Sequence, residues 1–208
     1  DKFHGINGPL SVSDQRIQLP LLNEFQNAAE EFGIPKTKDF NTGNNNGCGY
    51  FQVTEKDGFR CSTAVGDLNP IKERKNLSII TNAHVKKINF ENKIAKEVEY
   101  WQDNELKKVN SNKEIILSSG AIGSPQILQT AVIWDSNKLS QLGIYIIKDS
   151  NGVGENLQDH LMFRPVYKVK NIPTLNKKIN SIIGKLMIGM EYVFFRRGPM
   201  TMGASQLC

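Results

Sequence analysis

The sequence predicts a mixed α/β and α+β architecture in which the chain contributes parts of two packed layers. Strand-like segments of alternating polarity recur between residues 76 and 110, and an apolar segment at 114–118 runs directly into a helical pattern. Long amphipathic stretches begin at Pro20 and Ile179. The 208 residues, 39% hydrophobic and 23% charged, are typical of a globular protein. A chain of this length can hide about 70% of its unfolded surface.

The N-terminal third predicts one long helix among turns. Pro20 suits the first position of a helix, apolar residues follow at helical spacing, and Gly33 suits its end. We further expect short strands at 10–13 and 50–53, a loop at 41–49 and a short helix capped by Ser62 or Thr63.

The middle of the chain predicts an antiparallel meander. Apolar residues repeat at every second position in four segments, 77–80, 84–90, 94–101 and 106–109. The polar connections at 91–93 and 102–105 are short. The last three of these strands should therefore pair in sequence order.

The segment after the meander is the best ligand-binding candidate on physical grounds. An apolar strand is expected at 114–118, and the small residues 119–125 lead from it into a helix that continues to Val132. A strand that turns into a helix in this way leaves backbone N–H groups pointing at an anion, and the helix dipole adds to the attraction.

The C-terminal part predicts a short helix, a glycine turn and a long amphipathic helix. The expected elements are a helix at 136–142, strands at 144–147 and 161–169, a turn at 151–156 and a helix at 179–195. Lysines flank the apolar stripe of that last helix, which fits either a membrane-surface helix or a helix packed on a sheet. We favour packing on a sheet, which is commoner, and expect no membrane contact.

Composition argues against several classes of protein. No apolar run approaches the ~20 residues of a membrane-spanning helix. The three cysteines show no C-x-x-C spacing, which argues against disulfides and thiolate metal sites and for a reducing compartment, so we expect a cytoplasmic protein without metal. The net charge of +5 is dispersed without interleaved aromatic residues, so we expect no nucleic-acid partner.

Five blocks in order resemble the glucose-methanol-choline (GMC) oxidoreductase family. They are Gly5-Ile6-Asn7-Gly8-Pro9-Leu10, Asp39-Phe40-Asn41, Gly58-Phe59-Arg60-Cys61-Ser62-Thr63-Ala64, residues 115–128, and Gly152-Val153-Gly154-Glu155-Asn156-Leu157-Gln158-Asp159-His160. The segment 195–201 is similar to the bacterial alcohol and choline dehydrogenase branch. The resemblance covers nearly the whole chain.

This resemblance implies a two-domain flavoenzyme. It has an FAD-binding, Rossmann-like domain and a substrate domain built on an antiparallel sheet, and it oxidises a small-molecule alcohol to an aldehyde by hydride transfer to FAD. In this chain it implies the start of the substrate domain with connecting loops at 1–70. The middle of the FAD-binding domain would follow at 71–160, and a strand and a helix of the substrate domain at 161–208.

The resemblance also implies site residues. Ser118, Ser119, Gly120 and Ala121 match positions along the ADP moiety of FAD, although small residues also allow tight strand–helix packing. Val85 matches a position whose backbone contacts the adenine, although it also fits an ordinary strand valine. Further expected positions are Asn156 and His160 in the loop near the flavin, and Met200, Met202 and Gln206 beside the substrate.

Parts of the family pattern are missing from this sequence. It contains no Gly-x-Gly-x-x-Gly phosphate-binding motif and no histidine after His160, whereas the family's catalytic histidine lies in a C-terminal segment. The glycine- and proline-rich second signature is replaced by residues 130–135, and His84 fits a surface residue better than a base.

We therefore expect no catalytic residue here and an internal fragment of a longer enzyme, whose partners are the missing N- and C-terminal parts. The alternative is a short, non-catalytic binding or interaction module that keeps the substrate-domain fold without flavin.

Overall fold

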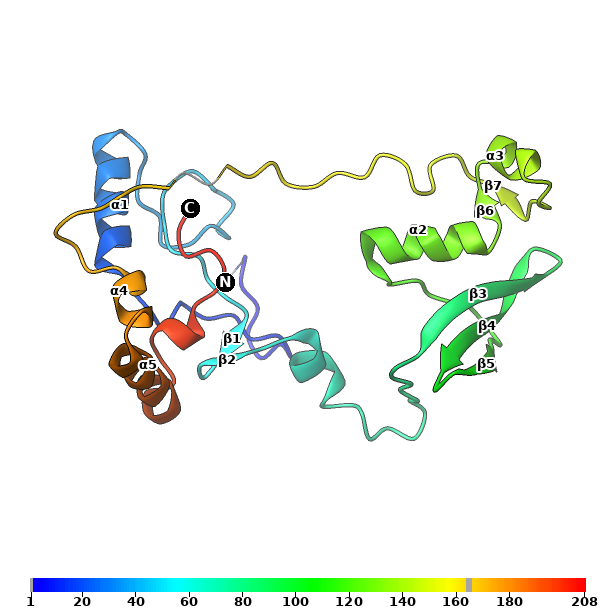
Figure 1. Cartoon of the computed structure of the whole chain (residues 1–208), viewed down its shortest axis with the longest axis horizontal. Helices are drawn as coiled ribbons and strands as arrows, with labels where there is room; N and C mark the ends of the chain where they lie inside the picture. The colour runs from blue at the N-terminus through cyan, green and yellow to red at the C-terminus, as the bar shows by residue number, and fades with distance from the viewer. Residues whose placement is uncertain (1, 164–165) are drawn as a thin grey trace. The chain divides into compact units, whose positions relative to one another are not determined.

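The computed structural model describes residues 2–163 and 166–208, which form two compact units (Figure 1). Unit 1 comprises Asp1–Leu77 and Val166–Cys208, and unit 2 comprises Ser78–Pro165. Both helices and antiparallel strands are present, as the mixed fold class predicts.

The antiparallel meander of unit 2 is confirmed. Its strands β3 (His84–Glu91), β4 (Ile94–Gln102) and β5 (Glu105–Asn110) pair in the order β3-β4-β5. Positive φ angles occur at both central residues of each hairpin, 49° and 66° at Asn92 and Lys93, and 52° and 62° at Asp103 and Asn104. Two-residue turns of this kind match the right-handed twist of the strands they join, so the short polar connections set the register.

The sheet of unit 2 has one apolar and one polar face. Ile88 and Tyr100 are buried on neighbouring strands, whereas Glu99, whose side chain alternates to the opposite face, belongs to a polar network. Helix α2 (Gly120–Thr130) packs against β3, and Ala131 at its C-terminal end is buried. The helix is thereby fixed beside the edge strand of the meander.

A short parallel pair completes unit 2. Strand β6 (Ile133–Trp134) pairs with β7 (Lys148–Asp149), and α3 (Ser136–Gln141) lies between them in the sequence. The carboxylate of Asp135 caps α3 by accepting hydrogen bonds from the amides of Asn137 at 2.8 Å and Lys138 at 3.2 Å. The predicted helix at 136–142 is confirmed, whereas the strand expected at 144–147 is wrong, because the pairing with β6 uses the next two residues.

Unit 1 contains more helix and loop than strand. Its elements are α1 (Pro20–Glu31), β1 (Glu55–Lys56), β2 (Phe59–Arg60), the π-helix η1 (Ala64–Leu68), α4 (Leu175–Ile179), α5 (Ile182–Phe195) and the 3-10 helix η2 (Pro199–Thr201). The predicted helix from Pro20 is confirmed. The strands expected at 10–13 and 50–53 are reduced to single bridges, Ser13 to Val53 and Tyr50 to Leu207.

Side-chain contacts between distant segments hold unit 1 together. The Arg196 guanidinium lies 4.6 Å from the ring centroid of Phe59 and 5.0 Å from that of Tyr192. Gly58, between β1 and β2, has φ +80°, and a Cβ there would lie 2.6 Å from the Arg196 carbonyl oxygen. Arg16 Nε lies 3.2 Å from Oε1 of the buried Glu55. Only glycine at position 58 permits the turn between β1 and β2 to lie this close to the Arg196 carbonyl oxygen.

Three expected strands are wrong. Residues 77–80, 114–118 and the described parts of 161–169 form no ladder, and residues 164–165 lie outside the described residues. A strand requires a neighbouring edge for its hydrogen bonds, and no described strand supplies one here. Ile116 and Phe163 are accordingly 77% and 88% exposed.

Burial is lower than the sequence length suggests. The accessible surface of 16632 Å² is about half of what an unfolded chain of this mass exposes, so the expected 70% burial is wrong. Helix α5 has no buried residue, and its apolar residues Ile182, Ile183 and Phe194 are exposed. Within the described ranges, no helix combines the length and apolarity needed to cross a membrane.

Candidate functional site

Helix α2 begins where the sequence predicts an anion-binding turn. Gly120, its first residue, has φ +78°, a conformation that glycine adopts most easily. The Ser119 amide donates a hydrogen bond to Ser124 Oγ at 3.0 Å. The next amides belong to the first turn, whose N–H groups have no partner within the helix. The positive end of the helix dipole therefore lies at 119–122.

A cleft of about 420 Å³ lies between β3 and α2, and we call it the β3 cleft. It is lined by residues 83–86 of the β3 segment, by Trp101 of β4, and by Ser119, Gly123, Gln126, Ile127 and Thr130 of the α2 segment. Two predicted site residues, Val85 and Ser119, are thus brought together although they come from separate motifs. β3 is an edge strand, so part of its backbone has no partner within the sheet.

One charged side chain and one aromatic ring line the β3 cleft. Lys86 is the charged side chain that lines it, and no Asp or Glu does. The Lys86 ammonium lies 5.7 Å from the Trp101 ring centroid and 3.6 Å from Glu99 Oε2. A cation, an aromatic ring and a helix N-terminus therefore border one cleft.

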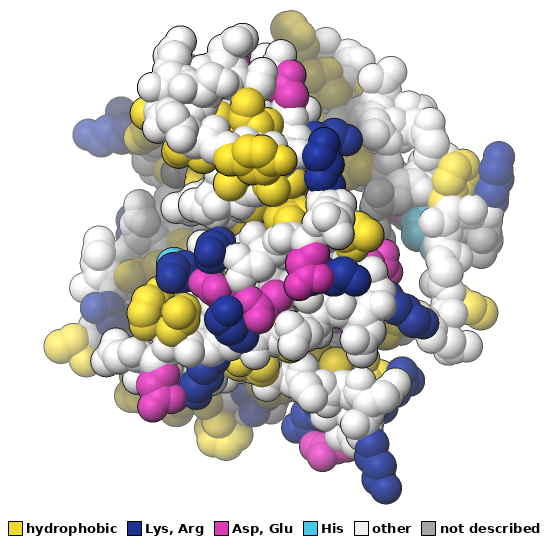
Figure 2. Space-filling view, turned by 90° about the vertical axis from the view of Figure 1, so that its right-hand side faces the viewer, with side chains coloured by type: hydrophobic (Ala, Val, Ile, Leu, Met, Phe, Trp, Pro, Cys, Tyr) yellow, Lys and Arg dark blue, Asp and Glu magenta, His cyan; other side chains and the backbone are white. Residues whose placement is uncertain are grey.

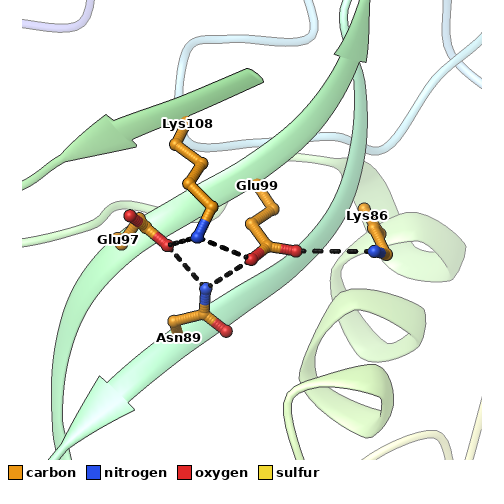
Figure 3. A network of polar contacts seen from close by, with 5 residues as sticks. All are labelled: Lys86, Asn89, Glu97, Glu99 and Lys108. Atoms are coloured by element: carbon orange, nitrogen blue, oxygen red, sulfur yellow. Dashed lines mark hydrogen bonds and ion pairs between the residues drawn. The ribbon is translucent and has the colours of Figure 1, made fainter. Parts of the chain in front are cut away.

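A polar network holds the strands beside this cleft (Figure 3). Asn89 Nδ2 donates to Glu97 Oε1 at 2.7 Å and to Glu99 Oε1 at 2.9 Å. Lys108 Nζ lies 3.0 Å from Glu97 Oε1 and 3.2 Å from Glu99 Oε1. The hydrogen bonds from Asn89 and then Lys108 lower the pKa of Glu99 to about 2, and they also lower the pKa of Glu97. Both carboxylates are therefore ionised at neutral pH.

Basic and acidic side chains are interspersed over the face shown in Figure 2. Charges of opposite sign lie close together near the centre of that view, and hydrophobic side chains lie between and around them. Neither sign of charge dominates this face.

A second hollow, of about 570 Å³, lies on another side of α2, and we call it the glycine-loop hollow. Ala121 and Pro125 of α2 line it together with Gly152 and Gly154. Pro125 has no N–H to donate to the Ala121 carbonyl. Gly154 has φ +81°, and a Cβ there would collide with Gln129 Nε2. Because Ala121 lines this hollow and does not line the β3 cleft, this predicted residue faces the glycine loop.

Four predicted cofactor residues, Ser118, Gly120, Asn156 and His160, line neither cavity. Ser118 is exposed immediately before Ser119. Asn156, with φ +57°, is exposed in the glycine loop, although its neighbours Glu155 and Leu157 line the hollow. His160 is exposed, and its backbone amide donates to Asp159 Oδ1 at 2.7 Å. The Asp159 carboxylate therefore binds the backbone at this doublet.

The predicted substrate residues Met200, Met202 and Gln206 all belong to unit 1. Met200 is exposed in η2, and Met202 follows it. Gln206 is half-buried, and its Nε2 donates to the Gly203 carbonyl at 2.6 Å. A hollow of about 360 Å³ in unit 1 is lined by Gly198 and Pro199 but by none of these three.

The cysteines lie in unit 1. Cys48 and Cys61 are buried free thiols, and Cys208 is an exposed one. Burial, and then the charge of Cys208, raises the pKa of the Cys48 thiol. In the described part of the chain, no group of His, Cys, Asp and Glu has the arrangement of a metal site.

Sequence reasoning missed Lys86 and Trp101 as residues of the cleft. The meander register places Trp101 opposite His84, so hairpin pairing carries a signal for Trp101. Lys86 lies at a register shift between the pairs Val85–Tyr100 and Lys87–Glu99. A bulge of this kind changes which way a side chain points and has no sequence signature here.

Residues 1–162 match the GMC oxidoreductase family. The chain is 35% identical over 207 residues to the alcohol dehydrogenase (acceptor) of Pseudomonas putida, covering 98% of this chain and 37% of that protein. It is 34% identical to human mitochondrial choline dehydrogenase, covering 93% of this chain and 32% of that protein. The chain thus spans just over a third of the first of these relatives.

Solved structures are also similar to this chain over nearly its whole length. An FAD-dependent oxidoreductase from Chaetomium thermophilum has a TM-score of 0.86 and 27% identity, covering 99% of this chain and 37% of that one. A formate oxidase with a TM-score of 0.80 and 24% identity, covering 98% of this chain and 36% of that one, shares the fold. Because residues 1–162 match the family model, the chain belongs to the GMC oxidoreductase family.

Proposed function

We propose that this chain is part of an FAD-dependent oxidoreductase that acts on the CH–OH group of a small alcohol, and that unit 2 binds the ADP moiety of FAD in the β3 cleft. The observation that carries the proposal is that Val85 and Ser119 line the same cleft. The relatives named alcohol dehydrogenase and choline dehydrogenase support the substrate class.

The chemistry of the β3 cleft fits an adenine nucleotide. Trp101 offers an aromatic surface, β3 offers unused backbone groups at its edge, and Lys86 with the start of α2 offers positive charge. No Asp or Glu lines the cleft, although the carboxylate of Glu99 lies 3.6 Å from the Lys86 ammonium. Ser118 and Gly120 flank Ser119, so the proposal keeps them as neighbours of the nucleotide.

The glycine-loop hollow would extend the cofactor site. Ala121 faces the loop residues Gly152 and Gly154, and the space beside Gly152 is open, whereas the Gln129 side chain fills the space beside Gly154. Asn156 and His160 follow in the same loop and are exposed, so their side chains are accessible to a cofactor. When bound, FAD supplies the oxidising chemistry, and the chain's residues bind and orient it.

The catalytic base is proposed to lie outside these 208 residues. His84 lines the β3 cleft, and at the exposed His160 the neighbouring Asp159 carboxylate accepts from the backbone amide. Neither shows the oriented base that proton removal requires. The exposed apolar residues, such as Ile116 and Ile182 and Ile183 of α5, suit a chain that packs against further protein. We propose that the chain alone does not oxidise alcohols.

The two units are proposed to belong to different domains. Unit 2 would be the middle of the FAD-binding domain, and unit 1 would contribute to the substrate domain, with Met200, Met202 and Gln206 on the substrate side. We also propose that the protein is cytoplasmic.

Equilibrium dialysis of purified 1–208 with FAD tests the cofactor assignment. We expect weak FAD retention that excess ADP reverses and excess riboflavin does not, because the β3 cleft would hold the ADP end. FAD binding that ADP leaves unchanged would contradict the assignment, as would no binding at millimolar FAD.

Dye reduction tests the assignment of the catalytic base. Purified 1–208 with FAD should show no dye reduction when choline or a primary alcohol is added. Alcohol-dependent reduction above the level of FAD alone would show that a base lies within these residues.

A further inference from the structure

Two predicted substrate residues lie on one short segment of unit 1, residues 202–208, which we call the substrate-side segment. Met202 begins this segment and Gln206 lies near its end. Leu207 forms an antiparallel bridge with Tyr50, and the segment forms no longer ladder with the described residues. Ordering a segment costs conformational entropy, so one with so little backbone pairing needs further contacts to hold its side chains in place.

The backbone of Phe51 is shared between the substrate-side segment and a segment near the N-terminus. Its amide donates to the Gln206 carbonyl at 3.0 Å. On the other side, Ser13 and Val53 exchange backbone hydrogen bonds of 2.9 Å each. A regular antiparallel continuation of that pairing would give the Phe51 carbonyl a backbone donor from Gln15. The donor that this carbonyl receives is instead the side chain of Gln15.

The half-buried side chain of Gln15 joins the two segments. Its Nε2 donates to the carbonyl oxygens of Phe51 and Gln206, each at 2.9 Å. An amide NH₂ group has two N–H donors, so both are used. The two acceptors lie 36 and 191 positions further along the chain. These bonds therefore fix the substrate-side segment on a distant part of unit 1.

We propose that Gln15 is a positioning residue that fixes the substrate-side segment, and with it Met202 and Gln206, on unit 1. The place of this segment beside the substrate rests on the proposed function. Gln206 Nε2 donates to the Gly203 carbonyl at 2.6 Å, which ties the Gln206 side chain to its own segment. A Cβ at Gly203 would lie 3.5 Å from Val53 Cγ1, so this turn lies against the residues that Gln15 joins. One amide group thereby sets where both predicted substrate residues lie.

Amide hydrogen exchange of 1–208, followed by nuclear magnetic resonance, tests this role in the absence of FAD and alcohol. Gln15→Leu removes both donors at a similar side-chain size. Exchange protection of the Phe51 and Cys208 amides should fall about tenfold, because two hydrogen bonds are lost and two carbonyls lose a donor. The methyl signal of Met202 should shift, whereas that of Met187 in α5 should stay where it is, because the change is local.

Gln15→Glu tests whether a donor is required at this position. An ionised carboxylate cannot donate a hydrogen bond, whereas a protonated carboxyl group donates one. Protection should therefore be lost at neutral pH and partly recovered below about pH 4, relative to wild type at the same pH. Gln18→Glu is the matched control, because it makes the same change at an exposed neighbouring glutamine, and it should keep wild-type protection.

Wild-type protection in Gln15→Leu would overturn the proposal, as would an equal loss in Gln18→Glu. Loss of protection throughout α1 and α5 would overturn it too, by showing that Gln15 holds unit 1 as a whole. A Gln15→Glu variant that recovers nothing at low pH would refute the donor role. These readouts need neither cofactor nor substrate, so failure of the proposed function would appear in the dialysis and dye-reduction tests and not here.

Discussion

The two units are held together in different ways. In unit 2, consecutive strands of one meander pair along their length, and Ile88 and Tyr100 are buried against neighbours close in sequence. In unit 1, single bridges and side-chain contacts join segments far apart, as when the Tyr192 hydroxyl donates to the Gly58 carbonyl at 3.3 Å. Unit 2 should therefore depend on its apolar core, and unit 1 on a few polar contacts.

The largest effect should come from the core of unit 2. Ile88→Ala removes a buried side chain and should destabilise unit 2 by about 3 kcal/mol. Urea unfolding followed by amide signals of both units measures this, with Ile94→Ala at an exposed position as the control. An equal loss of stability in unit 1 would show that the units unfold together.

A smaller effect is expected from the ion pair of unit 1. Arg16→Met leaves the carboxylate of Glu55, which is 5% exposed, without its cation. Because Arg16 itself is partly exposed, the loss should be about 2 kcal/mol, below the range for fully buried pairs. Adding Glu55→Gln should recover part of it. A single variant as stable as wild type would contradict a central role for this contact.

Acid should weaken unit 2 through Glu99. Its pKa falls from an ordinary 4.5 to about 2 on folding, so the ionised form is favoured in the folded state. The stabilisation is complete above pH 4.5 and is lost as the pH falls from 4.5 towards 2. Amide hydrogen exchange of unit 2, followed from pH 4.5 towards 2, measures this loss of stability. Glu99→Gln should flatten the dependence, and an unchanged slope would contradict this.

The smallest effect should come from the cap of α3. Asp135→Ala removes the acceptor for two amides and should destabilise the local structure by about 1 kcal/mol, whereas Asp135→Asn should retain most of the cap. Exchange rates of the α3 amides measure this. Equal exchange in both variants would show that the buried Leu139 holds the helix without the cap.

Sequence predicted the parts of the fold that rest on local contacts. The meander follows from alternating residues and short polar turns, and α1 and α3 follow from helical spacing. The strands expected at 114–118 and in the described parts of 161–169 failed because alternation or apolarity does not supply a pairing edge. Val85 and Ser119 were predicted through the family resemblance. The position of Lys86 in the cleft depends on a bulge that has no signature in the residue pattern.

Hydrogen–deuterium exchange of 1–208 with and without saturating ADP tests the central claim most directly. If unit 2 binds the nucleotide in the β3 cleft, protection should appear at residues 83–86 and 119–127, and unit 1 should exchange as before. Protection confined to unit 1, or no protection at saturating ADP, would contradict the account.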